Sequence, residues 1–285
     1  MSGRLPLGLS SILLGCVVAT TALLGPWAFG VIRYRTSSTT LNQIVGADAA
    51  ALTVVAPLAV IAGILVLRHH LVGPVLALAP SVFVVYTYTQ LIVGEEYLRL
   101  PGNNERFFPL LLGGFILAGG IVVAAWRALD PADLPPVSPR LGRTYAVVLA
   151  VVAAYLLVGL HLPSLVDALR DAPTRTEYVS SPTPFWLVKL MDLGIVAPVA
   201  AVTAVGLWRR SARALATAYA VVGGFTLLAA SVTGMALTMY RHGDPDAALP
   251  TVAVFAAFTL TFAGLTATLY RPLFTRRAEL VHSGG

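Results

Sequence analysis

Long apolar segments alternate with short polar connections along almost the whole chain. Each apolar segment is roughly 20 residues or longer, which as an α-helix is enough to cross a hydrocarbon core about 30 Å thick. The pattern therefore predicts an all-α fold, an integral membrane bundle of about eight transmembrane helices. The predicted spans are 6–32, 48–67, 71–94, 107–126, 144–166, 185–208, 212–239 and 249–270.

The composition supports this prediction. Apolar residues make up 57% of the chain and charged residues only 11%, too few polar side chains to cover a water-soluble globule. The net charge of +6 comes from arginines at the ends of apolar runs, without the interleaved aromatics of a nucleic-acid-binding surface. We therefore expect the lipid bilayer, and no nucleic acid, as a partner. The single cysteine, Cys16, excludes an intrachain disulfide.

The arginines also predict the orientation of the chain. Eleven of them lie in the connections on the side of the two termini, and seven lie in the opposite connections. The positive-inside rule then places both termini in the cytoplasm. Only Lys189 among the 19 basic residues is a lysine, which together with the excess of Ala and Val is typical of a high-GC bacterial genome. The predicted location is a bacterial plasma membrane, crossed several times.

A proline-rich stretch divides the spans four and four. The predicted organisation is a first half at 1–129, a cytoplasmic linker at 130–143, a second half at 144–271 and a cytoplasmic tail at 272–285.

An internal repeat would explain the equal division of the spans. Val55-Ala56-Pro57 recurs 141 residues later as Val196-Ala197-Pro198, and an arginine follows eleven residues after each proline, at Arg68 and Arg209. Four helices in each half give a parallel repeat, related by an axis along the membrane normal. Coincidence in a chain rich in Ala and Val is the alternative.

Ionisable side chains within the apolar spans are costly and therefore point to function. Lys189 and Asp192 lie in the sixth span, three residues apart, and the 141-residue spacing relates Lys189 to Asp48 at the predicted start of the second span. We hypothesise that Asp48 and Lys189 form a charge pair near the axis, and that Asp192 partners Lys189, a cation or a proton. The alternative is that Lys189 extends to the lipid headgroups and that Asp48 only starts a helix.

The third span supplies a second polar cluster. Tyr86, Tyr88 and Gln90 precede the adjacent carboxylates Glu95 and Glu96, and Tyr86 and Gln90 share one helix face. With Asp48, Lys189 and Asp192, these residues lie toward the predicted extracytoplasmic side and form our candidate binding site. The alternative is a solvated helix end beside an interfacial aromatic belt.

No metal site or particular cofactor is indicated by the sequence. His69 and His70 follow Arg68 in a short connection that suits headgroup contact, and His161 has no ligand partner at a regular spacing. HExxH, GxSxG, phosphate-loop and dinucleotide-binding patterns do not occur.

Several short runs of the sequence resemble those of a known group of proteins. They are Tyr86-Thr87-Tyr88, Gly94-Glu95-Glu96-Tyr97 and Asp192-Leu193-Gly194-Ile195-Val196-Ala197-Pro198, the last continuing to Arg209-Arg210. In these runs the chain resembles a loose group of uncharacterised prokaryotic multi-pass membrane proteins. The resemblance implies the multi-pass architecture and carries no activity with it.

Two functions fit these features. The first is the binding or transport of a small polar solute, an ion or a lipid at a site open to the extracytoplasmic side. The second is an intramembrane enzyme acting on a lipid or isoprenoid, with Glu95, Glu96 or Asp192 as general acid or base and with Tyr86 and Tyr88 shaping a cleft. The scarcity of polar residues toward the cytoplasmic side weakens the transport hypothesis. An accessory subunit without chemistry of its own is a third possibility.

Overall fold

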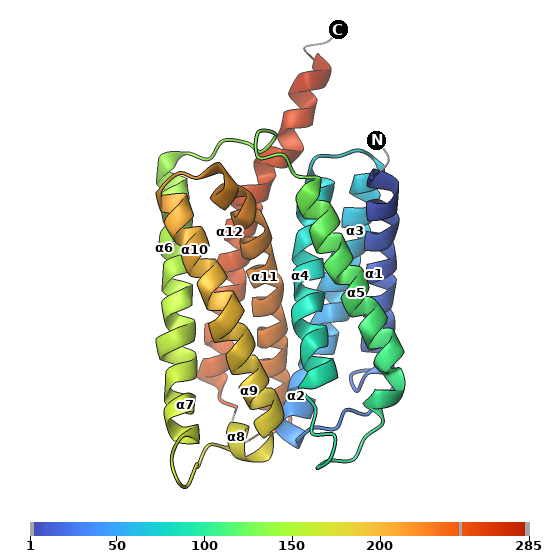
Figure 1. Cartoon of the computed structure of the whole chain (residues 1–285), viewed down its shortest axis with the longest axis vertical. Helices are drawn as coiled ribbons and strands as arrows, with labels where there is room; N and C mark the ends of the chain where they lie inside the picture. Colours follow the sequence, from blue (N-terminus) through green and yellow to red (C-terminus); the bar gives the residue numbers. More distant parts are fainter. Residues whose placement is uncertain (1–2, 245–246, 283–285) are drawn as a thin grey trace.

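The computed structural model describes residues 3–244 and 247–282, with side chains as far as Phe274 in the last helix. These residues form helices and connections, with no β-strand among them. Eight helical units in this part of the chain are long and apolar enough to cross a membrane (Figure 1), which confirms the predicted all-α class and the predicted number of membrane-length helices. They comprise Arg4–Leu24, Ser38–Leu67, Val72–Val93, Asn104–Arg127, Pro139–Ala168, Pro182–Trp208, Ala212–Arg241 and Leu249–Phe274.

The first four units contain α1 (Arg4–Leu24), α2 (Ser38–Ala50), the π-helix η1 (Ala51–Val55), α3 (Ala56–Leu67), α4 (Val72–Val93), the 3₁₀-helix η2 (Asn104–Phe107) and α5 (Phe108–Arg127). The last four contain α6 (Pro139–Ala154), the π-helix η3 (Tyr155–His161), α7 (Leu162–Ala168), α9 (Pro182–Met191), the π-helix η4 (Asp192–Val196), α10 (Ala197–Trp208), α11 (Ala212–Arg241) and α12 (Leu249–His282). The short helix α8 (Thr176–Ser180) lies in the connection before α9.

Several helix bounds differ from those predicted, and two of the three largest differences have clear causes. The first helix ends at Leu24 rather than near residue 32, because the next residues are Gly25 and Pro26. The second helix starts ten residues earlier than predicted, at Ser38, where the Ser37 hydroxyl accepts the N–H of Thr40 as an N-cap. In the segment 272–285, which was expected as a tail, α12 continues to His282, and residues 283–285 lie outside the described part.

The earlier start of α2 changes the position of Asp48. The residue lies ten positions, or about 15 Å, inside the helical unit rather than at its beginning. The interpretation that Asp48 only starts a helix is therefore wrong.

Three helical units contain a π-helical segment, and each segment is followed by a residue and then a proline. The prolines are Pro57 after η1, Pro163 after η3 and Pro198 after η4. Proline within a helix has no N–H and crowds the carbonyl four residues earlier. A preceding turn of wider, i to i+5 bonding accommodates that defect without ending the helix.

Each half of the chain forms its own group of helices. In Figure 1, α1, α3, α4 and α5 stand on the right, and α6, α10, α11 and α12 stand on the left. The groups meet where α11 packs on α2 and α4, and where α9 packs on α4. At Gly46 and Gly234, α2 and α11 approach so closely that a β-carbon on either glycine would overlap the other backbone.

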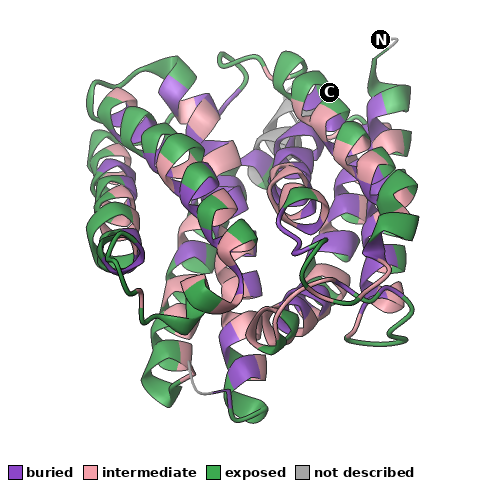
Figure 2. Ribbon diagram, turned by 60° about the horizontal axis from the view of Figure 1, so that its bottom comes forward, coloured by how far each residue is buried: buried purple, intermediate pink, exposed green. Residues whose placement is uncertain are grey.

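The outward faces of the bundle are apolar. Large hydrophobic side chains such as Leu9, Ile116, Val202 and Leu260 are more than half exposed. Figure 2 shows exposed residues along the outer sides of the helices and buried ones between them. This is the arrangement expected of helices surrounded by lipid. The start of α1 and the end of α12 lie at the same end of the bundle, at the top of Figure 1, which we call the terminal end.

Candidate functional site

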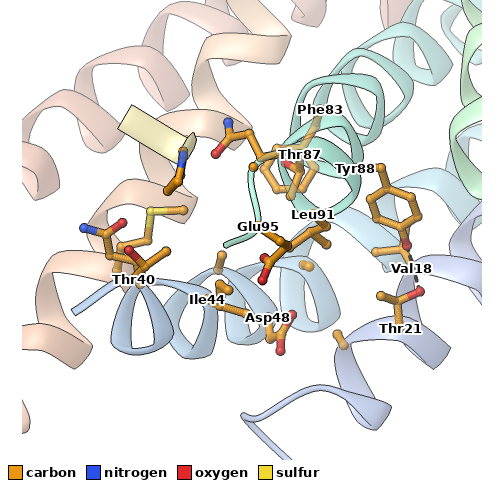
Figure 3. A pocket seen from close by; sticks show the side chains of 18 residues that line it. Val18, Thr21, Thr40, Ile44, Asp48, Phe83, Thr87, Tyr88, Leu91 and Glu95 are labelled. Carbon is orange, nitrogen blue, oxygen red and sulfur yellow. Dashed lines mark hydrogen bonds between the residues drawn. The ribbon is translucent and has the colours of Figure 1, made fainter. Parts of the chain in front are cut away.

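A cavity of about 70 Å³ lies toward the opposite end of the bundle, between α1, α2 and α4. Asp48 on α2 and Glu95 just beyond α4 line it, with polar side chains that include Thr87 and Gln90 (Figure 3). Pro184 and Met235 add walls from the second half. The cavity is therefore enclosed by both halves of the chain.

Asp48 is one of two buried carboxylates in the cavity wall, with an exposed fraction of 6%. The backbone N–H of Trp27 donates to its side chain. Gly25 lies directly against Oδ2, and any β-carbon there would overlap that oxygen. Within the described residues, Oδ2 has no hydrogen-bond partner.

Glu95 is the second buried carboxylate in the cavity wall, with an exposed fraction of 4%. Its side chain reaches from the end of α4 toward α2 (Figure 3), and the backbone N–H of Arg35 donates to it. In the part of the chain that the structure describes, Oε2 lacks a partner. Burial raises the pKa of Glu95 to about 8, the Arg35 N–H opposes this shift, and the charge of Glu96 adds to it.

Tyr34 lies close to both carboxylates. It is buried, and its hydroxyl has no partner among the described residues. Burial raises the pKa of Tyr34 well above its ordinary value, and the charge of Asp48, then Tyr88 and then the charge of Glu95, raises it further. Tyr34 does not line the cavity itself, but it is a buried neighbour of both carboxyl groups that the sequence analysis missed.

The remaining walls of the cavity are neutral. The Tyr88 hydroxyl donates to Thr21 Oγ1 at 2.9 Å, which ties α4 to α1 beside the cavity. Gln43 and Gln90 supply amide groups, and Thr87 supplies a hydroxyl. Throughout residues 3–244 and 247–274, no Lys, Arg or His side chain lines the cavity. The protein therefore places two carboxyl groups here without a positive side chain beside them.

A second polar cluster joins the two halves. The Tyr86 hydroxyl of α4 donates to Asp192 Oδ1 at 2.8 Å, and His161 Nε2 contacts Asp192 Oδ2, also at 2.8 Å. Asp192 opens η4 and His161 closes η3, so both stand in π-helical segments. His161 Nδ1 is buried without a partner in the described structure. Asp192 thus has two partners, neither of which is Lys189.

Lys189 has its polar and aromatic contacts within the second half of the chain. Its Nζ lies 2.5 Å from Oε1 of Glu177 on α8 and 3.9 Å from the centre of the Phe185 ring. The hypothesis that Lys189 pairs with Asp48 is wrong, because Glu177 supplies the counter-charge within the same half. The aromatic ring adds a cation–π contact.

Glu96 has a structural role. Oε1 accepts the N–H of Thr183 at 2.8 Å, and Oε2 faces Arg99 at 3.4 Å. Thr183 is the second residue of α9, where a carboxylate satisfies a free N–H and favours the helix dipole. Glu96 therefore links the end of α4 to α9 and does not line the cavity.

The predicted binding set is thus divided into separate environments. Asp48, Tyr88, Gln90 and Glu95 come together at the cavity. Tyr86 and Asp192 belong to the cluster with His161, while Lys189 and Glu96 each have a partner elsewhere. His161 was set aside for want of a regularly spaced partner. His161 lies about 10 Å from the end of α7 at Ala168, and Tyr86 lies about as far from the end of α4 at Val93. This equal depth was the signal that could have placed His161 level with Tyr86.

The described residues contain no group of three His, Cys, Asp or Glu side chains placed to hold a metal ion. No family model matches the sequence, and comparisons with curated proteins and with solved structures find no match. Function is therefore inferred from the geometry of the site.

Proposed function

We propose that the chain is a multi-pass membrane protein that binds or transports a small polar solute or ion at the cavity of Asp48 and Glu95. One observation supports this proposal above all. Two carboxylates, each more than nine-tenths buried, present an unpartnered oxygen at one cavity within the described structure. Buried charges are costly unless they are paired, so the arrangement suits a ligand that supplies positive charge or hydrogen-bond donors.

The size of the cavity narrows the range of ligands. A volume of about 70 Å³ holds a few water molecules or a small ion or solute. The two carboxyl groups in the cavity wall also suit a polar ligand better than an acyl or isoprenoid chain. Among the candidate ligands, a solute or ion is therefore favoured over a lipid.

An internal duplication is part of the proposal, and local backbone features at the 141-residue spacing support it. The π-helix at Ala51–Val55 is matched by the one at Asp192–Val196. His69 and Arg210, which follow α3 and α10, both adopt left-handed backbone with φ of 56° and 58°. Non-glycine residues rarely adopt that conformation, so coincidence is a poor explanation for the match.

Contacts between the halves follow the same spacing. A β-carbon at Gly46 would meet Met235, and a β-carbon at Gly94 would meet Leu187. Since Leu187 is 141 residues after Gly46, and Met235 is 141 residues after Gly94, a two-fold axis would exchange these contacts. Gly94 and Met235 both line the cavity, so the proposed axis passes close to it. A parallel repeat of this kind places ligand sites at the interface between halves.

The proposed orientation places the terminal end of the bundle in the cytoplasm of a bacterial cell. The larger number of arginines in the connections at that end supports this orientation. The cavity then lies toward the extracytoplasmic side.

A thermal-shift screen of the purified chain against ions, polar metabolites and lipids tests the proposed function. We expect at least one small ion or polar solute to stabilise the wild type but not Asp48→Asn or Glu95→Gln. Glu96→Gln is the matched control, because it removes a neighbouring carboxylate that does not line the cavity. Equal stabilisation of all four proteins, or stabilisation by lipids alone, contradicts the proposal.

The second candidate function, acid–base catalysis on a lipid, is favoured by the His161 and Asp192 pair. Asp192 fixes the imidazole through Nε2 and leaves Nδ1 available to accept a proton. Leu157 and Val158, in the same π-helix as His161, are exposed on the outer surface, close to where a lipid would lie.

This second function has its own test. The protein is incubated in vesicles of phosphatidylglycerol with a polyprenyl phosphate, and new products are sought by mass spectrometry. Catalysis predicts a product that His161→Gln abolishes and His242→Gln retains. If no product forms, or if both variants form equal amounts of it, His161 has no catalytic role in this reaction.

A further inference from the structure

A second cavity, of about 180 Å³, lies at the terminal end of the bundle, at the opposite end from the candidate site. Trp126 and Leu129 form one wall at and just after the end of α5. Arg213 and Ala216 form another wall at the start of α11, and Pro131 of the linker completes the lining. The cavity therefore lies between the first half of the chain and the second.

The linker wall of this cavity is held in place by the hydrophobic core. Leu134, three residues after Pro131, is buried in that core, and Leu129 packs against it. The N–H of Leu134 donates to the Pro131 carbonyl and closes a turn beneath the wall. The cavity is thus a preformed feature of the fold.

Arg213 is the one charged side chain that lines this cavity within residues 3–244 and 247–274. The side chain is exposed, and no ion pair in the described structure includes its guanidinium. Asp130 and Asp133 flank Pro131 in the sequence, but neither lines the cavity. The Arg213 guanidinium is therefore available to an anion from outside the chain.

The position of the cavity along α5 and α11 corresponds to the level of the lipid headgroups. Both helices are long enough to cross a membrane, and Trp126 and Arg213 are each the second residue from a helix end. Tryptophan is enriched at the membrane–water interface, and basic pockets between membrane helices bind anionic headgroups. Val123 is three residues before Trp126 and Ile116 is seven residues before Val123, so they share one face of α5, where both are more than half exposed. An apolar path for acyl chains thus leads away from the cavity.

We propose that this cavity binds the phosphate of an anionic phospholipid, which bridges the two halves of the chain at the terminal end. The Arg213 guanidinium pairs with the phosphate, Trp126 packs beside the glycerol backbone, and the acyl chains lie in the bilayer along α5. A phosphate diester presents two charged oxygens, which match the paired N–H donors of a guanidinium.

Two features favour an anionic lipid over other phosphates. The described lining contains no carboxylate that could pair with the ammonium group of a zwitterionic headgroup. A free phosphate ion carries the same charge, but it gains nothing from the apolar wall of Trp126 and Leu129.

Native mass spectrometry of the purified full chain tests the inference. The protein in detergent is titrated with phosphatidylglycerol or phosphatidylcholine, and the dissociation constant of the first bound lipid is measured. We expect phosphatidylglycerol to bind at least about fivefold more tightly, and Arg213→Gln to weaken its binding about fivefold, as for one arginine at a membrane surface. Arg140→Gln is the matched control, because it removes a positive charge at the same end of the bundle but outside the cavity, and it should bind as the wild type does.

The outcomes separate the site, the lipid and the bridge. Equal affinities for the two lipids, or equal losses in Arg213→Gln and Arg140→Gln, overturn the proposed site. If inorganic phosphate or glycerophosphoglycerol, the headgroup without acyl chains, displaces the lipid at equal concentration, the ligand is a soluble phosphate and not a lipid. Phosphatidylglycerol should also raise the melting temperature of the wild type and of Arg140→Gln by more than that of Arg213→Gln. The same increase in all three proteins overturns the bridging of the two halves.

Discussion

Tyr86→Phe probes the contact that joins the two halves through Asp192. The substitution removes one hydroxyl and leaves the ring in place. Asp192 is 8% exposed and accepts two hydrogen bonds, from Tyr86 and His161, so it would lose one of its two partners. We expect the variant to unfold more readily than the wild type, because a buried carboxylate is left incompletely satisfied.

The size of the effect follows from the geometry. A hydrogen bond to a charged group contributes about 1.5–3 kcal/mol in soluble proteins, while membrane-protein cycles average about 0.6 kcal/mol and reach about 1.7. The Tyr86 distance of 2.8 Å is slightly longer than that of the shortest bonds to carboxylates. We therefore expect a loss of about 1–2 kcal/mol in the free energy of unfolding.

Unfolding in mixed micelles with increasing SDS, followed by tryptophan fluorescence, measures this loss. Tyr240→Phe is the control, because the Tyr240 side chain is exposed near the end of α11, where water can reach its hydroxyl. We expect the control to change stability by about 0.5 kcal/mol or less.

A double-mutant cycle completes the experiment. Tyr86→Phe should cost much less in the Asp192→Asn background, with a coupling of about 1 kcal/mol, because the charge-assisted bond is already lost there. If Tyr86→Phe destabilises no more than Tyr240→Phe and its effect adds to that of Asp192→Asn, the bond between Tyr86 and Asp192 does not stabilise the protein.

Three further predictions concern the cavity and its surroundings. Gly25→Ala should displace the Asp48 carboxylate and weaken ligand binding at least tenfold, measured by titration, whereas Gly119→Ala, on α5 where a β-carbon would meet no neighbouring atom, should leave the affinity unchanged. Because Glu95 binds its proton more tightly in the folded state, the melting temperature in alkali-free buffer should fall as pH rises from 4.5 to about 8, and Glu95→Gln should flatten this dependence. Gly46→Val should force α2 away from α11 and destabilise the chain by about 1–3 kcal/mol in the SDS assay; a stability like that of the wild type would contradict the close packing.

The number of spans and four of the cavity residues could be predicted from the sequence. Apolar length alone indicates a membrane helix, because a helix must satisfy its own backbone in lipid. Asp48 and Glu95 were found for the same reason, since carboxylates at such positions are costly. The start of α2 was missed because Ser38 and the residues after it are polar, and there the N-cap at Ser37, not hydrophobicity, begins the helix.

The partners of the polar residues were harder to predict. Glu177 reaches Lys189 from a connection whose conformation no periodic pattern encodes. His161 and Asp192 are 31 positions apart on neighbouring spans, and their contact depends on how those spans rotate about their axes. Composition and spacing give the depth of a residue in a span, but they leave its direction undetermined.

The π-helical turn at Asp192–Val196 fixes the rotational register of the sixth span. That turn holds one residue more than an ordinary α-helical turn, so removing one residue from it would restore α-helical bonding and leave the helix faces on either side nearly in place. Lys189 and Phe185 would then keep their direction relative to α10. A length change of a single residue, usually ruinous in a packed helix, can therefore be absorbed at this turn without altering the bundle.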